Sequence, residues 1–444
     1  SVDSISSFED AMKGDQIMSL TRFLLCSAGS LVASYLVTER DAVAAAEVPD
    51  DGKQLGTVYN ACMSTNFTVS SGPQITVKEY RDIVGWIVTA QPGVLAQNVG
   101  LPDPVSYRSE VATSYDKYVG GHIAEAVGAL RKAGTDQLAL SIEVCREQGV
   151  LIVASYRMNS EDYYERQLDL SDFGRAHKDW AIAGRNCLDP AIPEVYAHRM
   201  AIFREVAENY DIDGIEFDFK RWSHMISDPL KNHPILTQMV RDTRKMLDEV
   251  ARRKGRKKLI LGVRVEPILA GELDHQEFPG VRHGSPRNRS CRNTGLDVET
   301  WIEESLVDYV CPTFFWPKWP GLPRTAEFSE LARGTNVGVF PTIWPLPEWL
   351  PHSADQGPAR PIGADDRERR LRYRRDLGDL ALRCFADGAD GISAYNWVQH
   401  HQASMVKNPK RQSWGDGLKQ EQMAISPRFR SETSLREYLA EQEP

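Results

Sequence analysis

The repeated order of helix and then strand limits the fold of this chain more than any other feature of its sequence. From residue 150 onward, short runs rich in β-branched residues alternate with longer segments whose apolar side chains recur every three or four positions. Such alternation is typical of a parallel sheet, because consecutive parallel strands need a crossover connection between them. The expected strands span residues 55–63, 150–156, 213–219, 258–265, 309–315, 336–343 and 391–397.

Polar and aromatic residues follow these expected strands and do not precede them. In a (β/α)8 barrel the C-terminal ends of the strands carry the active site, whereas an open doubly wound sheet more often shows a Gly-rich first turn. The sequence contains neither a Gly-x-Gly-x-x-Gly motif after a strand nor a Gly-Lys-Ser/Thr phosphate loop. It therefore predicts an α/β protein with a (β/α)8 TIM barrel, long loops at its C-terminal face and no nucleotide cofactor.

Helices are expected between the strands. Residues 115–132 and 136–148 form two of them, the second closed by Gly149 as its C-terminal cap. Asp189-Pro190 is typical of a helix start, with an N-cap followed by Pro at the first helical position. Residues 64–110 give no clear pattern. Further helices are expected at 234–253, after Asp297, at 365–387 and near 433–441.

The chain of 444 residues is predicted to have three parts. Residues 1–50 form an N-terminal extension, 51–402 the barrel, and 403–444 a polar tail with a short helix. The apolar run 18–37 and the small residues 42–46 are typical of a secretory signal, and an amphipathic helix packed on the barrel is the alternative. Export and a cytoplasmic location both stay open, and no other run is long and apolar enough to span a membrane.

Composition and spacing exclude several classes of function. A formal net charge of −9 without a dominant basic stripe argues against a nucleic-acid partner. None of the seven cysteines forms a Cys-x-x-Cys pair, and none of the ten histidines forms a His-x-His pair, so no metal site is predicted. Cys187 and Cys291 lie in loop-like sequence, which leaves a disulfide between them open.

The candidate catalytic carboxylates are Glu216, Asp218 and Glu266. Glu216 and Asp218 alternate with apolar residues along the expected strand 213–219, so both face the same side of it. Their Cα atoms would lie about 6.6–6.8 Å apart by the strand rise, and their side chains would point the same way rather than face each other across a sugar ring. Glycoside cleavage needs two facing carboxyl groups. We therefore expect one acid from this strand and the other, Glu266, from the end of the next.

Several polar residues near these acids have two interpretations. Glu216 either takes part in the chemistry or forms a structural ion pair inside the barrel with Arg157 or Arg264. Arg157 and Asn159, which leave a strand end, either bind sugar hydroxyls or hold the acids in place. Arg221, like its neighbour Lys220, suits either an acidic sugar or solvent.

Aromatic and amide side chains also follow the strands, and indole rings stack on pyranose rings in wet clefts. Each of these residues taken alone suits a core position as well as a sugar-binding one. The expected substrate contacts of this kind are Trp222, Trp316, Trp344, Tyr395, Asn396, Trp397 and His400.

Three segments together resemble a known family. They are Ala154-Ser-Tyr-Arg-Met-Asn159, Asp213-Gly-Ile-Glu-Phe-Asp-Phe219 with Arg221, and Leu296-Asp-Val-Glu-Thr-Trp-Ile302 with Leu306-Val-Asp308. In these segments the chain resembles the family-10-like glycosyl hydrolases, many of them bacterial, over roughly residues 50–400. The resemblance implies a carbohydrate-active (β/α)8 barrel and supplies no particular sugar.

The sequence therefore leads to one main function and two alternatives. The main one is a glycoside hydrolase that cleaves a poly- or oligosaccharide by carboxylate catalysis without a cofactor. The first alternative is a catalytically silent barrel that binds carbohydrate. The second, a metal-dependent hydrolase, is disfavoured by the missing His-x-His ligands.

Overall fold

The computed structural model describes residues 47–68, 72–158, 167–220, 225–273, 289–314, 321–344, 363, 365–397 and 416–441. All of them belong to the unit that runs from Ala45 to Pro444, and the predicted N-terminal extension lies almost wholly outside them.

Parallel strands form one sheet within the described residues. Its order is β7-β6-β5-β4-β3-β2-β1-β9-β8. The strands are β1 (Thr57–Ala61), β2 (Val94–Gly100), β3 (Leu151–Arg157), β4 (Gly214–Asp218), β5 (Ile260–Val265), β6 (Tyr309–Pro312), β7 (Gly338–Val339), β8 (Thr342–Ile343) and β9 (Ile392–Tyr395).

The two ends of this sheet meet in the segment 338–343. Its first half, β7, pairs with β6, and its second half, β8, pairs with β9, which in turn pairs with β1. Because β7 and β8 are two short halves of one strand position, the sheet closes into a ring of eight. The expected (β/α)8 barrel is therefore confirmed. Strand β2 lies in the region 64–110, where no clear pattern is visible in the sequence.

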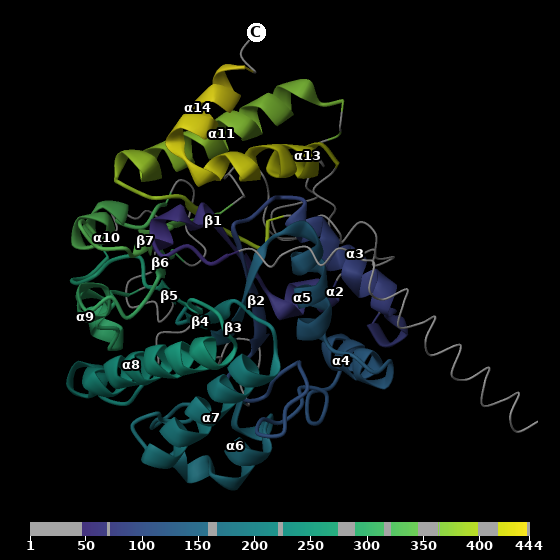
Figure 1. Ribbon diagram of the computed structural model, residues 1–444, viewed down its shortest axis with the longest axis vertical. Helices are drawn as coiled ribbons and strands as arrows, with labels where there is room; N and C mark the ends of the chain where they lie inside the picture. The colour runs from purple at the N-terminus through teal and green to yellow at the C-terminus, as the bar shows by residue number, and fades with distance from the viewer. Residues whose placement is uncertain are drawn as a thin grey trace, which may run out of the picture. The chain divides into compact units, whose positions relative to one another are not determined.

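Helices occupy the connections between the strands and lie around them (Figure 1). Pro193 opens the helix before β4, so the helix start predicted at Asp189-Pro190 is wrong. Asp189 instead accepts the backbone N–H groups of Ala191 and Ser227. The helices longer than six residues between strands are α3 (Val77–Val88), α4 (His122–Lys132), α5 (Gln137–Gln148), α7 (Pro193–Asn209), α8 (Pro229–Arg253), α10 (Thr325–Leu331) and α11 (Arg367–Ala386).

Two further helices follow the barrel. They are α13 (Asp416–Ile425) and α14 (Glu432–Ala440), and Figure 1 shows both beside α11. Glu421 of α13 is buried and pairs with Arg370 and Arg374 of α11, at 2.8 and 2.6 Å. The described end of the tail is thus docked on the last barrel helix.

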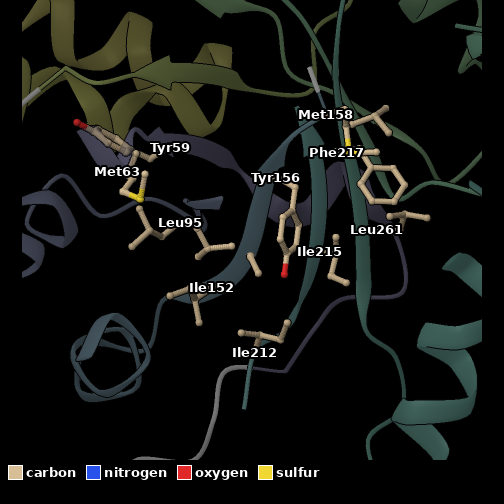
Figure 2. Close-up of a cluster of buried hydrophobic side chains, with 14 of the residues drawn as sticks. Tyr59, Met63, Leu95, Ile152, Tyr156, Met158, Ile212, Ile215, Phe217 and Leu261 are labelled. Atoms are coloured by element: carbon tan, nitrogen blue, oxygen red, sulfur yellow. The ribbon is translucent and has the colours of Figure 1, made fainter. Parts of the chain in front are cut away.

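The core lies on both sides of the sheet because successive strand residues face opposite sides. Residues such as Ile152, Tyr156, Ile215 and Phe217 belong to a large cluster with the apolar faces of the helices (Figure 2). A second, smaller cluster comes from the alternate positions of the strands and includes Val58, Val94, Leu151, Val153, Ile260 and Phe340. These side chains fill the N-terminal part of the barrel interior.

An ion-pair cluster fixes the N-terminal end of β4. Asp213 is fully buried and pairs with Arg146, at 2.7 Å, and with Arg256. It also accepts the backbone N–H of Ile152 on β3. This first acid of the Asp213–Phe219 motif therefore has a structural place, at the opposite end of the strand from Asp218.

Two further findings bear on the sequence predictions. Cys187 and Cys291 are buried thiols, and no disulfide joins them. None of the helices in the described ranges has the length and apolar character that crossing a bilayer requires.

Candidate active site at the C-terminal end of the barrel

The barrel interior changes from apolar to polar toward the C-terminal ends of the strands. Asn60 of β1, Ser155 of β3 and Glu216 of β4 follow the apolar interior residues Val58 and Val153 at the two-residue period of a strand. These polar side chains contact one another across the barrel, although their strands are not all neighbours in the sheet. The polar layer is therefore an interior feature of the closed barrel.

Glu216 occupies the centre of this layer and has no exposed surface. Its carboxylate accepts hydrogen bonds from Asn60 Nδ2 at 2.8 and 3.0 Å, from Ser155 Oγ at 2.8 Å and from the Tyr309 hydroxyl at 2.8 Å. Burial raises the pKa of Glu216 above its usual value, and the nearby charge of Asp218 raises it further. Neither Arg157 nor Arg264 pairs with it, so the alternative of a structural ion pair with one of these arginines is wrong, and the hydrogen bonds come from neutral donors.

Gly262 makes the contact between Tyr309 and Glu216 possible. A Cβ atom at this position of β5 would lie 2.0 Å from Cζ of Tyr309, far inside van der Waals contact. Only glycine leaves room for the phenol ring to cross the barrel and reach the carboxylate. Burial of that ring beside Glu216 holds the pKa of Tyr309 well above its ordinary value, so its hydroxyl remains a donor.

Asp218, the last residue of β4, pairs with Arg264 of β5. Arg264 Nη1 lies 2.9 Å from Asp218 Oδ2, and the backbone N–H of Lys220 donates to Oδ1 at 2.9 Å. Arg264 Nε donates to Thr313 Oγ1 at 3.2 Å, and its guanidinium lies 4.2 Å from the ring centroid of Tyr395. Because both Asp218 and Arg264 are buried, this pair is shielded from solvent.

Glu266 follows β5 and pairs with Lys220, two residues beyond Asp218. The ion pair joins Lys220 Nζ to Glu266 Oε2, which also accepts the backbone N–H of Arg289 at 3.1 Å. Burial lowers the pKa of Lys220, while the charge of Glu266 partly opposes that shift. Glu216, Asp218 and Lys220 thus follow one another at period two, and Asp218 and Glu266 lie in adjacent ion pairs.

Arg157 and Tyr395 connect β3 with β9 at the same end of the barrel. Arg157 Nη2 donates to the Tyr395 hydroxyl at 2.9 Å and lies 2.7 Å from Cys62 Sγ. The side chains of Arg157 and Tyr395 are buried. Arg157 therefore holds the Tyr395 hydroxyl, and the Tyr395 ring in turn lies over Arg264.

The two described tryptophans of the predicted set have different surroundings. Trp344 is partly exposed, donates its indole N–H to Phe314 O at 2.6 Å and lies 5.6 Å from Tyr395 between ring centroids. Trp397 is fully buried, donates to Ile343 O and packs edge-on against Phe429. Trp344 is therefore the more exposed of the two, whereas Trp397 packs in the core of the described structure, and the substrate contacts of both stay predictions.

Asn396 has a structural role in the described residues. Its side-chain oxygen accepts the backbone N–H of Cys62 at 2.8 Å, which ties the end of β9 to the end of β1. Five other predicted substrate contacts lie outside the described residues, namely Asn159, Arg221, Trp222, Trp316 and His400.

Some members of the polar layer were not foreseen. Asn60, Ser155, Tyr309 and Ser393 complete it, and Ser393 Oγ donates to Asn60 Oδ1 at 2.9 Å. Period two gives a signal for Ser155, which lies two residues before Arg157 on one strand face. No comparable signal marks Tyr309, because its contact with Glu216 depends on the closure of the barrel.

Comparison with known proteins gives a partial sequence match and a shared architecture. The chain is 28% identical over 182 residues to the glycosyl hydrolase DigH of Escherichia coli K12 and to that of Shigella flexneri. The match covers 37% of this chain and spans only 40% of the length of each curated relative. No family model matches the chain. Membership of the family-10-like glycosyl hydrolases thus stays a prediction.

Solved structures with a similar arrangement include two carbohydrate-active enzymes. The α-L-fucosidase isoenzyme 2 from Paenibacillus thiaminolyticus has a TM-score of 0.42 at 12% identity, covering 84% of this chain and 48% of the enzyme. A family GH18 chitinase from Cycas revoluta has a TM-score of 0.42 at 13% identity, covering 85% and 99%. Scores this low assign no activity. The chain is a (β/α)8 barrel with partial sequence similarity to curated glycosyl hydrolases.

Proposed function

We propose that this protein is a glycoside hydrolase whose catalytic carboxylates are Asp218 and Glu266. The observation that carries the proposal is the pair of adjacent ion pairs, Asp218 with Arg264 and Glu266 with Lys220, at the C-terminal ends of β4 and β5. Two carboxyl groups at this end of a barrel are what glycoside cleavage needs. The sequence similarity to curated glycosyl hydrolases supports the same reaction class.

The two cations, Arg264 and Lys220, suggest different catalytic roles for the two carboxyl groups that they pair with. A guanidinium does not release its proton in a protein, so Arg264 is a permanent positive partner of Asp218, which suits a nucleophile or a general base. A buried lysine can release its proton, and burial already lowers the pKa of Lys220. We assign Glu266 as the proton donor, with a proton that passes from Lys220 Nζ to the Glu266 carboxylate and then to the leaving glycosidic oxygen.

The remaining residues support these two groups. Glu216 is fully enclosed by donors from β1, β3 and β6, so it acts through Asp218 and makes no contact with substrate. Tyr395 stacks on Arg264 and is held by Arg157. Trp344 offers a partly exposed indole for a sugar ring.

The test is release of reducing ends from a panel of poly- and oligosaccharides. The wild type should release them, and Asp218→Asn and Glu266→Gln should each reduce kcat by about 10²- to 10⁴-fold, as expected for loss of a catalytic carboxyl group. Asp248→Asn, on the exposed side of α8, is the matched control and should keep full activity. A wild type that binds glycans and releases nothing would instead identify a catalytically silent carbohydrate-binding barrel.

A further inference from the structure

A cavity lined in part by polar side chains has none of the carboxylates Glu216, Asp218 and Glu266 among its lining residues. It is bordered by the segment after β2, by residues around α6 (Asp172–Ala176) and by the first turns of α7. Its empty volume is about 340 Å³, including the part that opens to solvent. Both the segment after β2 and the start of α7 belong to the C-terminal end of the barrel, because α7 runs back before β4. The cavity is therefore at the same end as Asp218 and Glu266.

Arg199 of α7 lines this cavity and is only 6% exposed. Its one hydrogen bond within the described part of the chain runs from Nη2 to the backbone oxygen of Leu188, at 3.1 Å. No described carboxylate lies within ion-pair distance of it. Asp189 is the acid whose charge acts on Arg199, and its Oδ1 accepts two backbone N–H groups. The Nε and Nη1 groups of Arg199 are therefore available to a ligand.

A nearly buried cation without a counter-ion is costly, since desolvation is not offset by an opposite charge. Burial accordingly lowers the pKa of Arg199 to about 10, and the charges of Cys187 and Asp189 offset that only in part. An apolar side chain would fill the same place at lower cost. The charge is best explained by an anionic group that enters the cavity.

Two further polar side chains face the same space. His198 is oriented by Asp103, whose Oδ2 lies 2.9 Å from His198 Nε2, and by stacking on Phe173 at 3.9 Å between ring centroids. Ser171 Oγ accepts the backbone N–H of Gly174, which leaves its hydroxyl hydrogen to donate. The cavity thus combines a guanidinium, an imidazole fixed in one orientation and a hydroxyl donor.

We propose that this cavity binds the carboxylate of an acidic sugar unit in the glycan that the barrel acts on. A guanidinium presents two parallel N–H donors that match a planar carboxylate. The identification of the ligand as part of a glycan rests on the proposed hydrolase function. Binding of a carboxylate in the cavity does not depend on turnover.

The test measures binding of glucuronate, glucose and inorganic sulfate by calorimetry, with the intact chain. The wild type should bind glucuronate, glucose should give no signal, and sulfate should bind more weakly. Arg199→Met should weaken glucuronate binding by at least tenfold. Arg204→Met is the matched control, because Arg204 belongs to the same helix, has a side chain that is 44% exposed and pairs with Glu208 and Glu249. It should bind glucuronate as the wild type does.

Equal glucuronate binding by wild type and Arg199→Met would overturn the inference, and so would equal responses to glucose and glucuronate. Sulfate binding as tight as glucuronate binding would overturn the assignment to a carboxylate. Because no carboxylate in the described ranges forms an ion pair with this cation, Arg199→Met should unfold at the same or a higher temperature, so misfolding is not an explanation for lost binding. Asp218→Asn should keep full glucuronate binding, which separates this site from the hydrolase. In an active wild type, Arg199→Met should raise KM only for oligosaccharides with an acidic unit.

Discussion

The Lys220 ammonium and the Glu266 carboxylate form an ion pair in which the side chains are 0% and 1% exposed. Lys220 comes two residues after Asp218, and Glu266 comes two residues after Arg264. The Asp218–Arg264 pair therefore joins β4 to β5, and the Lys220–Glu266 pair joins the residues that follow these two strands. Each of these four groups is thus buried next to a partner of opposite charge. Removing one partner leaves the other without compensation.

The first prediction concerns this pair. Glu266→Gln should lower the free energy of unfolding by about 3–5 kcal/mol, because it removes the carboxylate from a buried ion pair with Lys220. The double variant Lys220→Met/Glu266→Gln should recover a large part of that stability in urea titrations, since no unpaired charge remains. It should stay inactive, because Glu266 is still missing. Recovery of activity in the double variant would contradict a catalytic role for Glu266.

Arg264→Lys should separate positioning from binding. A lysine keeps the charge but cannot contact Asp218 and Thr313 together while lying flat on Tyr395, as the guanidinium does. We expect kcat to fall at least about tenfold, equivalent to about 1.4 kcal/mol in the barrier, with KM little changed. Steady-state kinetics on the cleaved substrate measures kcat and KM separately. A rise in KM with unchanged kcat would place Arg264 in substrate binding instead.

The raised pKa of Glu216 makes stability depend on pH. Between the ordinary pKa of 4.5 and the raised pKa, the folded protein keeps a proton that the unfolded chain has released. Stability therefore falls as pH rises through that window, by about 1.4 kcal/mol for each pH unit that the window spans. Glu216→Gln does not titrate, so its stability relative to the wild type should improve as pH rises through the window. Urea titrations from pH 4 upward measure the difference, and a constant difference would count against a raised pKa.

Gly262→Ala should destabilise the protein, because the Tyr309 ring occupies the space where a Cβ atom would lie. The new methyl group would overlap the phenol ring and push it away from Glu216. We expect a loss of at least about 1–3 kcal/mol in the free energy of unfolding, as for overpacked cores. Gly85→Ala in α3 is the control, because a Cβ there meets nothing within 4 Å and should be neutral or stabilising by up to about 1 kcal/mol. Similar effects of the two changes would refute the packing argument.

Trp344→Ala should weaken substrate binding if the indole stacks on a sugar ring. A lost aromatic contact of about 0.5–1.5 kcal/mol corresponds to a KM raised roughly 2- to 13-fold, with kcat less affected. Trp86→Ala, on the outer helix α3, is a control for the loss of a partly buried indole and should leave KM unchanged. An unchanged KM in Trp344→Ala would place that ring outside the substrate path.

The architecture could be predicted from the sequence because it depends on local patterns. The β-branched runs and the three-to-four-residue spacing of the helices are each visible within some ten to twenty residues. The strand β2 was not foreseen, since its seven residues include Gln97 and Asn98 and follow a Pro- and Gly-rich region. The helix start at Asp189-Pro190 was misplaced because Asp189 forms turn contacts with Ala191 and Ser227 instead.

The sequence alone determined which residues share a strand face, and therefore that Glu216 and Asp218 point into one space and that Glu266 follows the next strand. Only the tertiary structure decided their partners. Arg264 pairs with Asp218 and not with Glu216, Lys220 turns inward to Glu266, and Tyr309 reaches Glu216 from a strand 93 positions away in the chain. Periodicity fixes a direction along one strand, whereas the partner across a barrel depends on strand register and closure, and these are set by contacts between distant parts of the chain.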